Sequence, residues 1–556
     1  MSAFTPETKN DTDHGDELPS SISSASGPDR EQGDDDGNLA YATPLRLFMI
    51  MCTLGLSTLI AALDLGIVAT AIPQITSDFH ALDHIGWYSG ACFLLVGTTS
   101  APWGKMYKYF SATYTYMTAL ALYLVGSVVA AAAPNSIALI IGRALQGWGC
   151  AGTLGGSVLI INFTAEPKIR PLLIGLWMGI FMIATTIGPL IGGVFTSEVN
   201  WRWCFWVNLP VGGTAIVLQF LFLSMPKHVK PTPATWTEIL RHLDLPGWTL
   251  LLTSVICFLL AMEWGGLAKA WSDGAVIATL TLWLALSIVF VVVEWFQGDY
   301  AIMPLRMLKA RTSWSHLLYA WIANLGNFQI LFYLPIYFQS VHGSSAIMSG
   351  VYSLPFMAFY TFGAIVSGIL VGKTRLLQPI ELVSGLVVVL GAALIYCIDI
   401  GTSKAWWIGA QIPFGLGIGL GNQVPITALQ GFATPETVAA TMGVAFMAQS
   451  ISGAYFVSAG NSIFNNYLTK TLSVTAPHLS TSEILYIGVA ELKNVFHGEE
   501  LALIRQAYMV GIKDVFAFAL AGACLTVVLA LIVPFKRLPD HETKKAEDKE
   551  AAGKAS

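Results

Sequence analysis

The sequence predicts an all-α membrane protein with fourteen transmembrane helices, from its composition, the spacing of its apolar segments and an internal repeat. Of its 556 residues, 54% are hydrophobic and only 11% are charged, and the mean hydropathy is +0.63. Soluble globular domains carry about 25% charged residues. This composition argues against a soluble enzyme and for a chain that lies largely in lipid.

Apolar segments of the length that a bilayer requires recur along the chain. A hydrocarbon core of about 30 Å needs about 20 apolar residues in a helix. Fourteen segments meet that need, near 47–72, 86–104, 115–133, 137–161, 172–195, 204–224, 247–265, 275–296, 314–338, 349–371, 380–399, 406–427, 438–463 and 514–535.

The charged residues indicate which helix ends face the cytoplasm. Residues 1–45 are acidic and contain no apolar stretch, so we expect a disordered tail and not a signal peptide. Basic residues favour cytoplasmic loops. With the N-terminus inside, the short outer loops hold only three of them, Arg202, Lys269 and Lys404. We therefore expect both tails, 1–45 and 538–556, in the cytoplasm and the long loop 464–513 outside. We expect this loop to be partly helical, in EELALIRQAYMVGIKDVF.

An internal repeat divides the chain into two halves. A shift of 268 positions places Gly147 on Gly415, Gly149 on Gly417, Pro167 on Pro435 and Gly175 on Gly443. Related membrane-spanning halves are typical of transporters, although four such matches also arise by chance in glycine-rich helices. We expect an N-terminal six-helix bundle at 46–224, a linker with two extra transmembrane helices at 225–298, and a C-terminal six-helix bundle at 299–537.

Several motifs of the chain are similar to those of a known family. They are LDLGIVATAIPQI at 63–75, GRALQGWGCAG at 142–152, IGPLIGG at 187–193, WRWCFWVNLPVGG at 201–213 and EWGGLAKAWSDG at 263–274. Over about residues 46–536 the chain resembles the major facilitator superfamily, and within it the fourteen-span drug:proton antiporters, especially fungal efflux pumps for toxins and secondary metabolites. The resemblance implies the major facilitator fold and proton-driven export.

Two charges of opposite sign lie deep in the predicted spans. Asp64 is about nine residues from the outer end of the first span, and Arg143 is about six residues inside the fourth. A charge at the bilayer centre costs roughly 3 kcal/mol on insertion scales, and such residues mark transport pathways. The resemblance implies that Asp64 and Arg143 form a proton-linked pair, with a static ion pair as the alternative. Gln146 and Gly147 share the helical face of Arg143.

Other acids within the spans are expected to matter less. Glu263, Glu294, Glu381 and Asp399 lie within a turn or two of helix ends, from which their side chains can reach water. The repeat places the uncharged Gln411 opposite Arg143. We therefore expect proton chemistry in the N-terminal half only.

The fifth span carries the sequence GPLIGG, with Gly188, Pro189, Gly192 and Gly193. Small residues one turn apart let helices approach closely, and the proline bends the span. The resemblance implies an antiporter motif that seals the cavity. Helix packing alone is the alternative.

The C-terminal half is expected to supply most of the substrate surface. Uncharged amides among aromatic residues suit a neutral, lipophilic ligand. The candidate cavity residues are Asn324, Asn327, Tyr333, Tyr337, Asn422, Gln423 and Gln449.

The loop after the second span departs from the family pattern G-x-L-x-D-R-x-G-R-R. The chain has GKMYKYFSATY at 104–114, where Lys108 replaces the aspartate, and Ala112 and Thr113 replace the later arginines. A gating latch centred on an aspartate therefore cannot be assumed.

These observations predict proton-coupled export of a small lipophilic compound, such as a drug or mycotoxin, by alternating access. The alternative is a proton-coupled importer of a nutrient or siderophore on the same fold. A membrane enzyme or a nutrient sensor fits less well, because no catalytic constellation and no large signalling tail is visible.

The chain has no phosphate-binding loop, no HExxH and no CxxC, so we expect no cofactor and no metal. The expected partners are a small molecule, protons and the bilayer, without nucleic acid, for a monomer in the plasma membrane or, alternatively, the vacuolar membrane.

Overall fold

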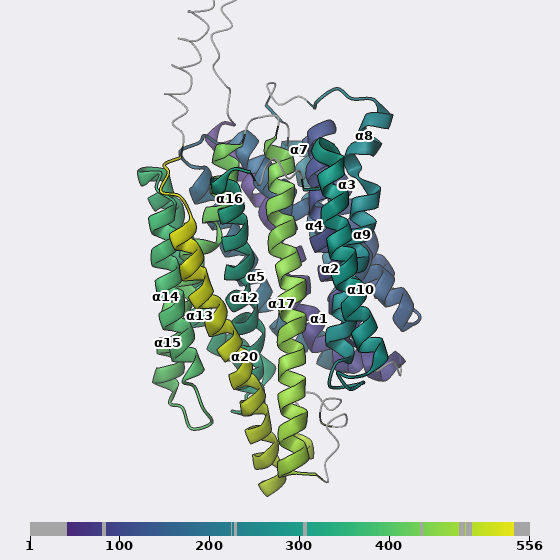
Figure 1. Ribbon diagram of the computed structural model, residues 1–556, viewed down its shortest axis with the longest axis vertical. Coiled ribbons are helices and arrows are strands. Elements are labelled where there is room, and N and C mark those ends of the chain that lie inside the picture. The colour runs from purple at the N-terminus through teal and green to yellow at the C-terminus, as the bar shows by residue number, and fades with distance from the viewer. Residues whose placement is uncertain are drawn as a thin grey trace, which may run out of the picture. The chain divides into compact units, whose positions relative to one another are not determined.

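Long helices that run side by side make up the part of the chain that the computed structural model describes (Figure 1). These residues form no β-strand. They fall within one compact unit, Tyr41–Ser556. The described residues are 42–79, 85–223, 225–226, 231–303, 309–433, 437–477, 484 and 492–538, so the tails at 1–41 and 539–556 lie outside them.

The first half of the chain forms the helices expected for six spans. They are α1 (Pro44–Phe79), α2 (Ile85–Tyr109), α3 (Ala112–Ala131), α4 (Ser136–Thr164), α5 (Arg170–Glu198), and the consecutive α6 (Trp203–Trp206) and α7 (Asn208–Phe222).

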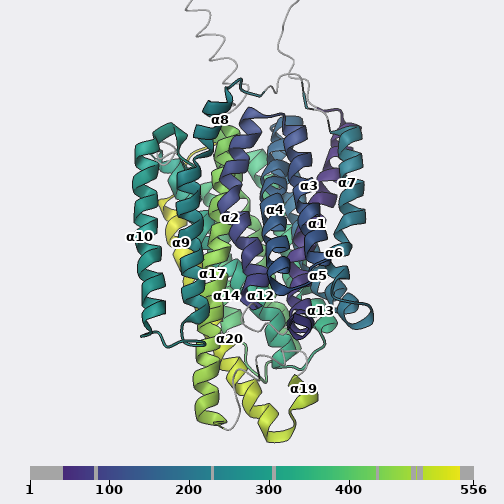
Figure 2. The same ribbon diagram turned by 90° about the vertical axis from the view of Figure 1, so that its right-hand side faces the viewer.

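The predicted insertion begins with the short, amphipathic α8 (Trp236–Leu243) and continues with α9 (Leu245–Trp264) and α10 (Gly274–Gln297), followed by the 3₁₀ turn η2 (Gly298–Tyr300). Helices α9 and α10 pack against each other, and α9 also contacts α2 and α17. Figure 2 shows the α9–α10 pair at one edge of the bundle. The division of the chain at 224 and 298 stays a prediction.

The second half again forms helices at the predicted spans. They are α12 (Arg311–Ser340), α13 (Ala346–Thr374), α14 (Gln378–Tyr396), α15 (Lys404–Asn422), α16 (Val424–Phe432), α17 (Val438–Thr475), the short α19 (Leu492–Val495) and α20 (Gly498–Ile532).

Twelve helical segments of the described chain are long and apolar enough to cross a membrane. Helices α2 and α15 are not among them, although both coincide with predicted spans. In α15, glycines replace larger apolar residues because neighbouring backbones come close: a Cβ on Gly415 would lie 2.2 Å from the carbonyl oxygen of Phe356. Close packing therefore lowers the hydropathy of α15 without removing it from the bundle.

The described residues of the predicted external loop 464–513 are mostly helical, and the position of this loop outside the membrane stays a prediction. Helix α17 continues to Thr475 and α20 begins at Gly498. Leu468, Leu472 and Ile504 are fully buried in these extensions. Because they pack into the core of the C-terminal half, the helices continue beyond the length that a bilayer alone would require. The helical character expected for EELALIRQAYMVGIKDVF is confirmed.

The glycines matched by the repeat occupy matching contacts. A Cβ on Gly147 of α4 would meet the backbone of α2 at 2.3 Å, and a Cβ on Gly415 of α15 would meet that of α13 at 2.2 Å. Gly149 and Gly417 likewise face α3 and α14. Pro435 lies outside the described residues. These contacts support the repeat over chance, because α2, α3 and α4 correspond to α13, α14 and α15.

The two halves meet through α2 with α17 and α5 with α13. Gly104 and Gly443 bring the first pair together, since a Cβ on Gly104 would lie 2.8 Å from the Cα of Gly443. In the second pair, a Cβ on Gly175 would lie 2.7 Å from the carbonyl oxygen of Ala364. No side chain separates the backbones at either crossing.

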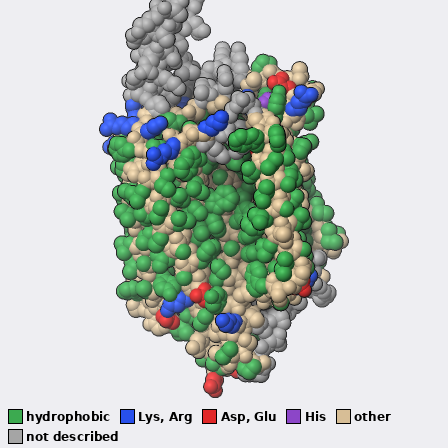
Figure 3. All heavy atoms as spheres, in the orientation of Figure 1, with side chains coloured by type: hydrophobic (Ala, Val, Ile, Leu, Met, Phe, Trp, Pro, Cys, Tyr) green, Lys and Arg blue, Asp and Glu red, His purple; other side chains and the backbone are tan. Residues whose placement is uncertain are grey.

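Basic side chains gather at one end of the unit. In Figure 3, an apolar band covers the middle of the visible face, and lysines and arginines cluster at the end where α1 begins and α20 ends. Main-chain bonds hold both chain ends there, from Ala42 N–H to Thr164 O and from Leu538 N–H to Arg375 O. This distribution matches the expected asymmetry of charge between the two membrane sides.

Two of the four acids expected to reach water are buried, so that expectation is wrong for them. Glu294 is 1% exposed and Glu381 is 0% exposed. Glu294 accepts a hydrogen bond of 2.7 Å from the backbone N–H of Met303, and Glu381 lies 2.8 Å from Nδ1 of His316. Partners from other segments allow these side chains to turn inward. Asp399 remains well exposed.

Candidate functional site

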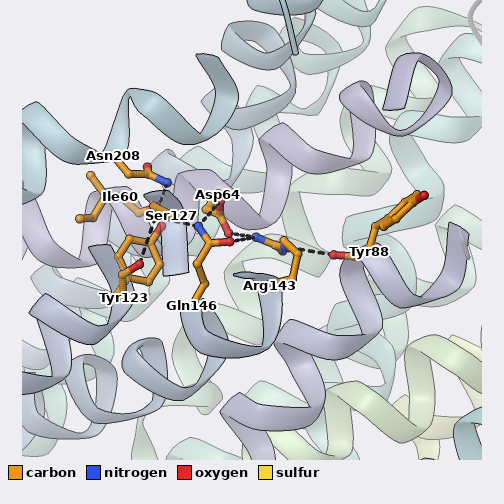
Figure 4. A network of polar contacts seen from close by, with 8 residues as sticks. All are labelled: Ile60, Asp64, Tyr88, Tyr123, Ser127, Arg143, Gln146 and Asn208. Atoms are coloured by element: carbon orange, nitrogen blue, oxygen red, sulfur yellow. Dashed lines mark hydrogen bonds and ion pairs between the residues drawn. The ribbon is translucent and has the colours of Figure 1, made fainter. Parts of the chain in front are cut away.

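Asp64 of α1 and Arg143 of α4 form an ion pair inside the N-terminal half. The guanidinium Nη1 donates to Oδ2 of Asp64, and both side chains are only 1% exposed. Figure 4 shows the two side chains pointing toward each other between the helices. The structure therefore brings together the two deep charges that the sequence singled out.

Arg143 also has partners besides Asp64. Its Nε donates to the carbonyl oxygen of Tyr88 at 2.8 Å, and its Nη1 donates to Oε1 of Gln146 at 2.9 Å. The guanidinium carbon lies 5.9 Å from the ring centre of Phe205. These contacts would hold the cation in place if Asp64 lost its negative charge.

Gln146 connects the ion pair to a wider polar network. Its Nε2 donates to Oδ1 of Asp64 at 3.3 Å and to the hydroxyl of Ser127 at 2.8 Å. The same hydroxyl accepts from Nδ2 of Asn208 at 3.3 Å and donates to the carbonyl oxygen of Tyr123 at 3.1 Å. The network in Figure 4 thus joins α1, α3, α4 and α7 around one carboxylate.

Sequence reasoning missed five members of this network, which are Ile60, Tyr88, Tyr123, Ser127 and Asn208. All five are buried. Asn208 lies within the motif WRWCFWVNLPVGG, and Ser127 is a single hydroxyl in an apolar run, so both carried a weak signal. Tyr88 takes part through its main chain, which leaves no mark on the sequence.

The GPLIGG motif packs against the turn of α1 that carries Asp64. A Cβ on Gly188 would lie 2.7 Å from the carbonyl oxygen of Leu63 and 2.8 Å from the Cα of Gly66. A Cβ on Gly66 would meet Cδ of Pro189 at 2.8 Å. The motif therefore contacts α1 at Gly66, which is two residues after the buried Asp64 along the chain.

The other two glycines of the motif differ from Gly188. Gly192 is buried. A Cβ added to Gly193 would meet nothing within 4 Å. The close approach to α1 therefore depends on the first glycine of the motif.

Gln411, the counterpart of Arg143 in the repeat, makes an analogous contact. Its Nε2 donates to the carbonyl oxygen of Tyr352 on α13 at 3.0 Å, just as Arg143 donates to that of Tyr88 on α2. The same position therefore ties equivalent helices together in both halves, but only Arg143 does so with a charge.

Three of the predicted cavity residues lie together near the junction of α15, α16 and α17. Asn422 donates to the hydroxyl of Tyr360 at 2.7 Å, and Gln449 donates to the carbonyl oxygen of Asn422 at 3.4 Å. Gln423 donates to the carbonyl oxygen of Ala364 at 2.7 Å. The helix breaks at this point, because Pro425 in the first turn of α16 has no N–H for an α-helical bond.

The four predicted cavity residues on α12 are not gathered at that junction. Tyr333 and Tyr337 belong to the apolar core of the C-terminal half. The hydroxyl of Tyr337 donates to the carbonyl oxygen of Asp399 at 3.0 Å, and Asn324 donates to the carbonyl oxygen of Ala320 in its own helix at 2.8 Å. Asn327 is buried. Their contribution to a substrate surface stays a prediction.

The degenerate loop at 104–114 is mostly helical, since α2 extends to Tyr109 and α3 begins at Ala112. Lys108 lies with its ammonium 5.3 Å from the ring centre of Tyr109. The neighbouring Lys105 is 4% exposed and donates to the carbonyl oxygens of three residues within or just after the insertion, His242, Tyr300 and Ala301. The end of α2 is therefore fastened to the inserted segment by a lysine.

Metal binding finds no support in the described part of the chain. No group of three His, Cys, Asp or Glu side chains there lies close enough to hold one ion.

Comparison with known proteins identifies the family. Residues 54–457 match the model of the Major Facilitator Superfamily. The chain is 63% identical over 500 residues to the efflux pump notK of Aspergillus sp. (strain MF297-2), covering 90% of this chain and 89% of that protein. It is 54% identical over 508 residues to a dehydrocurvularin exporter of Alternaria cinerariae, covering 91% and 87%.

A solved structure shows the same fold at low sequence identity. The human organic anion transporter MFSD10 superposes with a TM-score of 0.56 and 12% identity, over 88% of this chain and 100% of that one. The chain therefore belongs to the Major Facilitator Superfamily, and it is a multi-pass membrane transporter with the all-α fold of that family.

Proposed function

We propose that this protein exports a small, lipophilic secondary metabolite or drug in exchange for protons, as a fourteen-span antiporter that works by alternating access. The names of its fungal relatives support efflux over import. The observation that carries the proton coupling is the buried carboxylate of Asp64, held by Arg143 and Gln146. It is the deepest acid of the N-terminal half and lies beside the antiporter motif.

The chemistry follows from the charges of this site. Protonation of Asp64 from outside neutralises the carboxylate and weakens its bond to Arg143, which keeps its bonds to Tyr88 and Gln146. The helices α1 and α4 then lose a charge-assisted tie. Release of the proton to the cytosol restores the pair. We propose that these two states accompany the two orientations of the transporter.

One proton supplies enough energy for useful efflux. Its movement through about 100 mV yields about 2.3 kcal/mol, and two pH units add about 2.7 kcal/mol. Together these correspond to roughly 3.6 powers of ten in concentration.

Aromatic side chains between the two halves suit a lipophilic substrate. Phe93 of α2 lies 6.4 Å, between ring centres, from both Phe328 and Phe332 of α12. All three rings are half-buried. Together with the amides of Asn422 and Gln449, they offer apolar area with a few hydrogen-bonding groups. We propose that the substrate binds between these surfaces.

We place the protein in the plasma membrane as a monomer, with both termini in the cytoplasm. The gathering of lysines and arginines at the end that holds both chain ends supports this orientation. The vacuolar membrane is the alternative location.

Dehydrocurvularin, the compound named for the relatives, is the first probe. Cells that express the protein should retain less of it than cells without the protein. A protonophore should abolish the difference, whereas acute ATP depletion should preserve it while the proton gradient lasts. Efflux that follows ATP and ignores the gradient would refute the antiporter, and greater retention in the expressing cells would indicate an importer.

A further inference from the structure

The C-terminal half contains a buried acid and base that the proposed mechanism does not use. Glu381, near the start of α14, is 0% exposed, and His316, near the start of α12, is 1% exposed. The Nδ1 atom of His316 lies 2.8 Å from Oε1 of Glu381. The second carboxylate oxygen, Oε2, has no hydrogen-bond partner among the described residues.

The number of protons that the pair holds depends on the buried carboxylate of Glu381, of which only one oxygen has a hydrogen-bond partner. Buried carboxylate oxygens normally have partners, and a buried net charge is costly. With one proton, on either the imidazole or the carboxyl group, the pair is neutral overall. Without that proton, it carries an uncompensated negative charge that only water would stabilise. The closed, buried arrangement therefore favours one bound proton, and an open, hydrated arrangement allows it to leave.

The pair lies at a junction of helices. The hydroxyl of Tyr319 on α12 donates to the carbonyl oxygen of Glu381 at 3.2 Å and to the hydroxyl of Ser384 at 3.3 Å. Ser384 in turn donates to the carbonyl oxygen of Gly417 on α15 at 2.7 Å. These bonds link the turn of α14 that carries Glu381 to α12 and to α15, which ends at the predicted cavity residue Asn422.

A small cavity borders the same junction. Its volume is about 10 Å³, about the space that one water molecule needs. Tyr319, Ser384 and Asn422 all line it. Polar groups thus connect the turn that carries Glu381 with the predicted cavity residue Asn422.

In the described part of the chain, the ion pair of Glu381 is with His316. Helix α16 and the last two turns of α20 contain no ionisable residue. Arg311, at the start of α12, is exposed and donates to the carbonyl oxygen of Ile532. Among the described residues, the other ionisable groups at this end of the C-terminal half include Lys309 before α12, Tyr319 on α12, Lys373 and Arg375 at the end of α13, and Lys536 and Arg537 after α20.

We propose that His316 and Glu381 form a second proton-binding site, in the C-terminal half, which gives up its proton when α12 and α14 separate. This inference rests on the proposed proton coupling at Asp64 and adds a second proton to the cycle. It replaces the expectation that proton chemistry is confined to the N-terminal half.

The number of coupled protons tests this site. For n protons per substrate, the accumulation ratio changes by a factor of ten to the power n for each unit of pH difference. Purified protein in liposomes, with the membrane potential clamped at zero and dehydrocurvularin as the probe, should give about 100-fold per pH unit. Glu381→Gln, which is neutral at every pH, should give about tenfold per pH unit.

Control variants separate this site from its surroundings. Tyr319→Phe removes the hydrogen bonds of the Tyr319 hydroxyl to α14 but keeps both titratable groups and their contact, so it should retain about 100-fold per pH unit. If Glu381→Gln does not yield folded protein, the double variant His316→Gln with Glu381→Gln replaces the pair by two amides and should give about tenfold per unit.

The outcomes distinguish the two proposals. A wild-type protein that does not accumulate the probe in response to a pH difference refutes the proton coupling itself. If the accumulation ratio of the wild-type protein changes only tenfold per pH unit, the second site is overturned and the proton at Asp64 remains. The same conclusion holds if the wild type and Glu381→Gln, or the double variant that replaces it, show an equal change per pH unit.

Discussion

Replacing Asp64 by asparagine or alanine distinguishes a proton carrier from a structural strut. Removing one partner of a buried ion pair typically costs about 3 to 5 kcal/mol, and we expect this cost for Asp64→Ala. Asparagine keeps a carbonyl oxygen toward Nη1 of Arg143, which also retains Tyr88 and Gln146 as acceptors. Since a charge-assisted hydrogen bond is about twice as strong as a neutral one, Asp64→Asn should cost only about 1 to 2 kcal/mol.

The assay compares stability with transport. After heating in detergent, the fraction of monodisperse protein should decrease from wild type to Asp64→Asn and further to Asp64→Ala. In liposomes, Asp64→Asn should equilibrate dehydrocurvularin across the membrane without concentrating it. If the asparagine variant is as unstable as the alanine variant and also replacing Arg143 restores it, Asp64 is a strut. A well-folded Asp64→Asn protein that still concentrates the probe would refute the carrier assignment.

Three further predictions concern the packing and the topology. Gly188→Ala places a methyl group 2.7 Å from a carbonyl oxygen of α1 and should lower the free energy of unfolding by about 1 to 3 kcal/mol and reduce efflux. Gly193→Ala, whose methyl group would lie in open space, should leave both stability and efflux unchanged. Equal effects of the two substitutions would exclude the contact with α1 as the cause. Lys105→Met removes the donor to the carbonyl oxygens of His242, Tyr300 and Ala301 and should lower the free energy of unfolding by about 1 to 3 kcal/mol, measured by thermal unfolding. A similar loss in Lys108→Met would argue against this specific role. An epitope inserted between 476 and 497 should be reached by antibody on intact cells, and one at the C-terminus only after permeabilisation; the reverse labelling would invert the topology.

Much of the fold could be predicted from features that recur along this sequence. The number and order of the helices depend on runs of apolar residues, so each predicted span has a helix. The meeting of Asp64 with Arg143 was predictable because depth in a bilayer can be counted along each helix. The continuation of α17 around Leu468 was not, because the burial of this side chain depends on its packing into the core of the C-terminal half and not on lipid.

The buried pair His316–Glu381 shows where such counting fails. Glu381 lies three residues into α14, so its position along the helix allows the side chain to reach water. Its direction is instead set by His316, which is 65 positions away in the sequence. Distance to a helix end limits how far a charge can reach, but partners on other helices decide which way it turns.

The crossing of α2 and α17 at Gly104 and Gly443 has a consequence for how such exporters diversify. The two backbones touch there without an intervening side chain, so the packing of α2 against α17 at this crossing does not depend on the chemistry of the transported compound. Under the proposed binding mode, substitutions that change which compound is carried are expected elsewhere, among residues such as Phe93 and Phe332. Related transporters can therefore differ in the compound that they carry while Gly104 and Gly443 stay the same. Deep mutational scanning should find that these two positions tolerate few substitutions, whichever compound is used for selection.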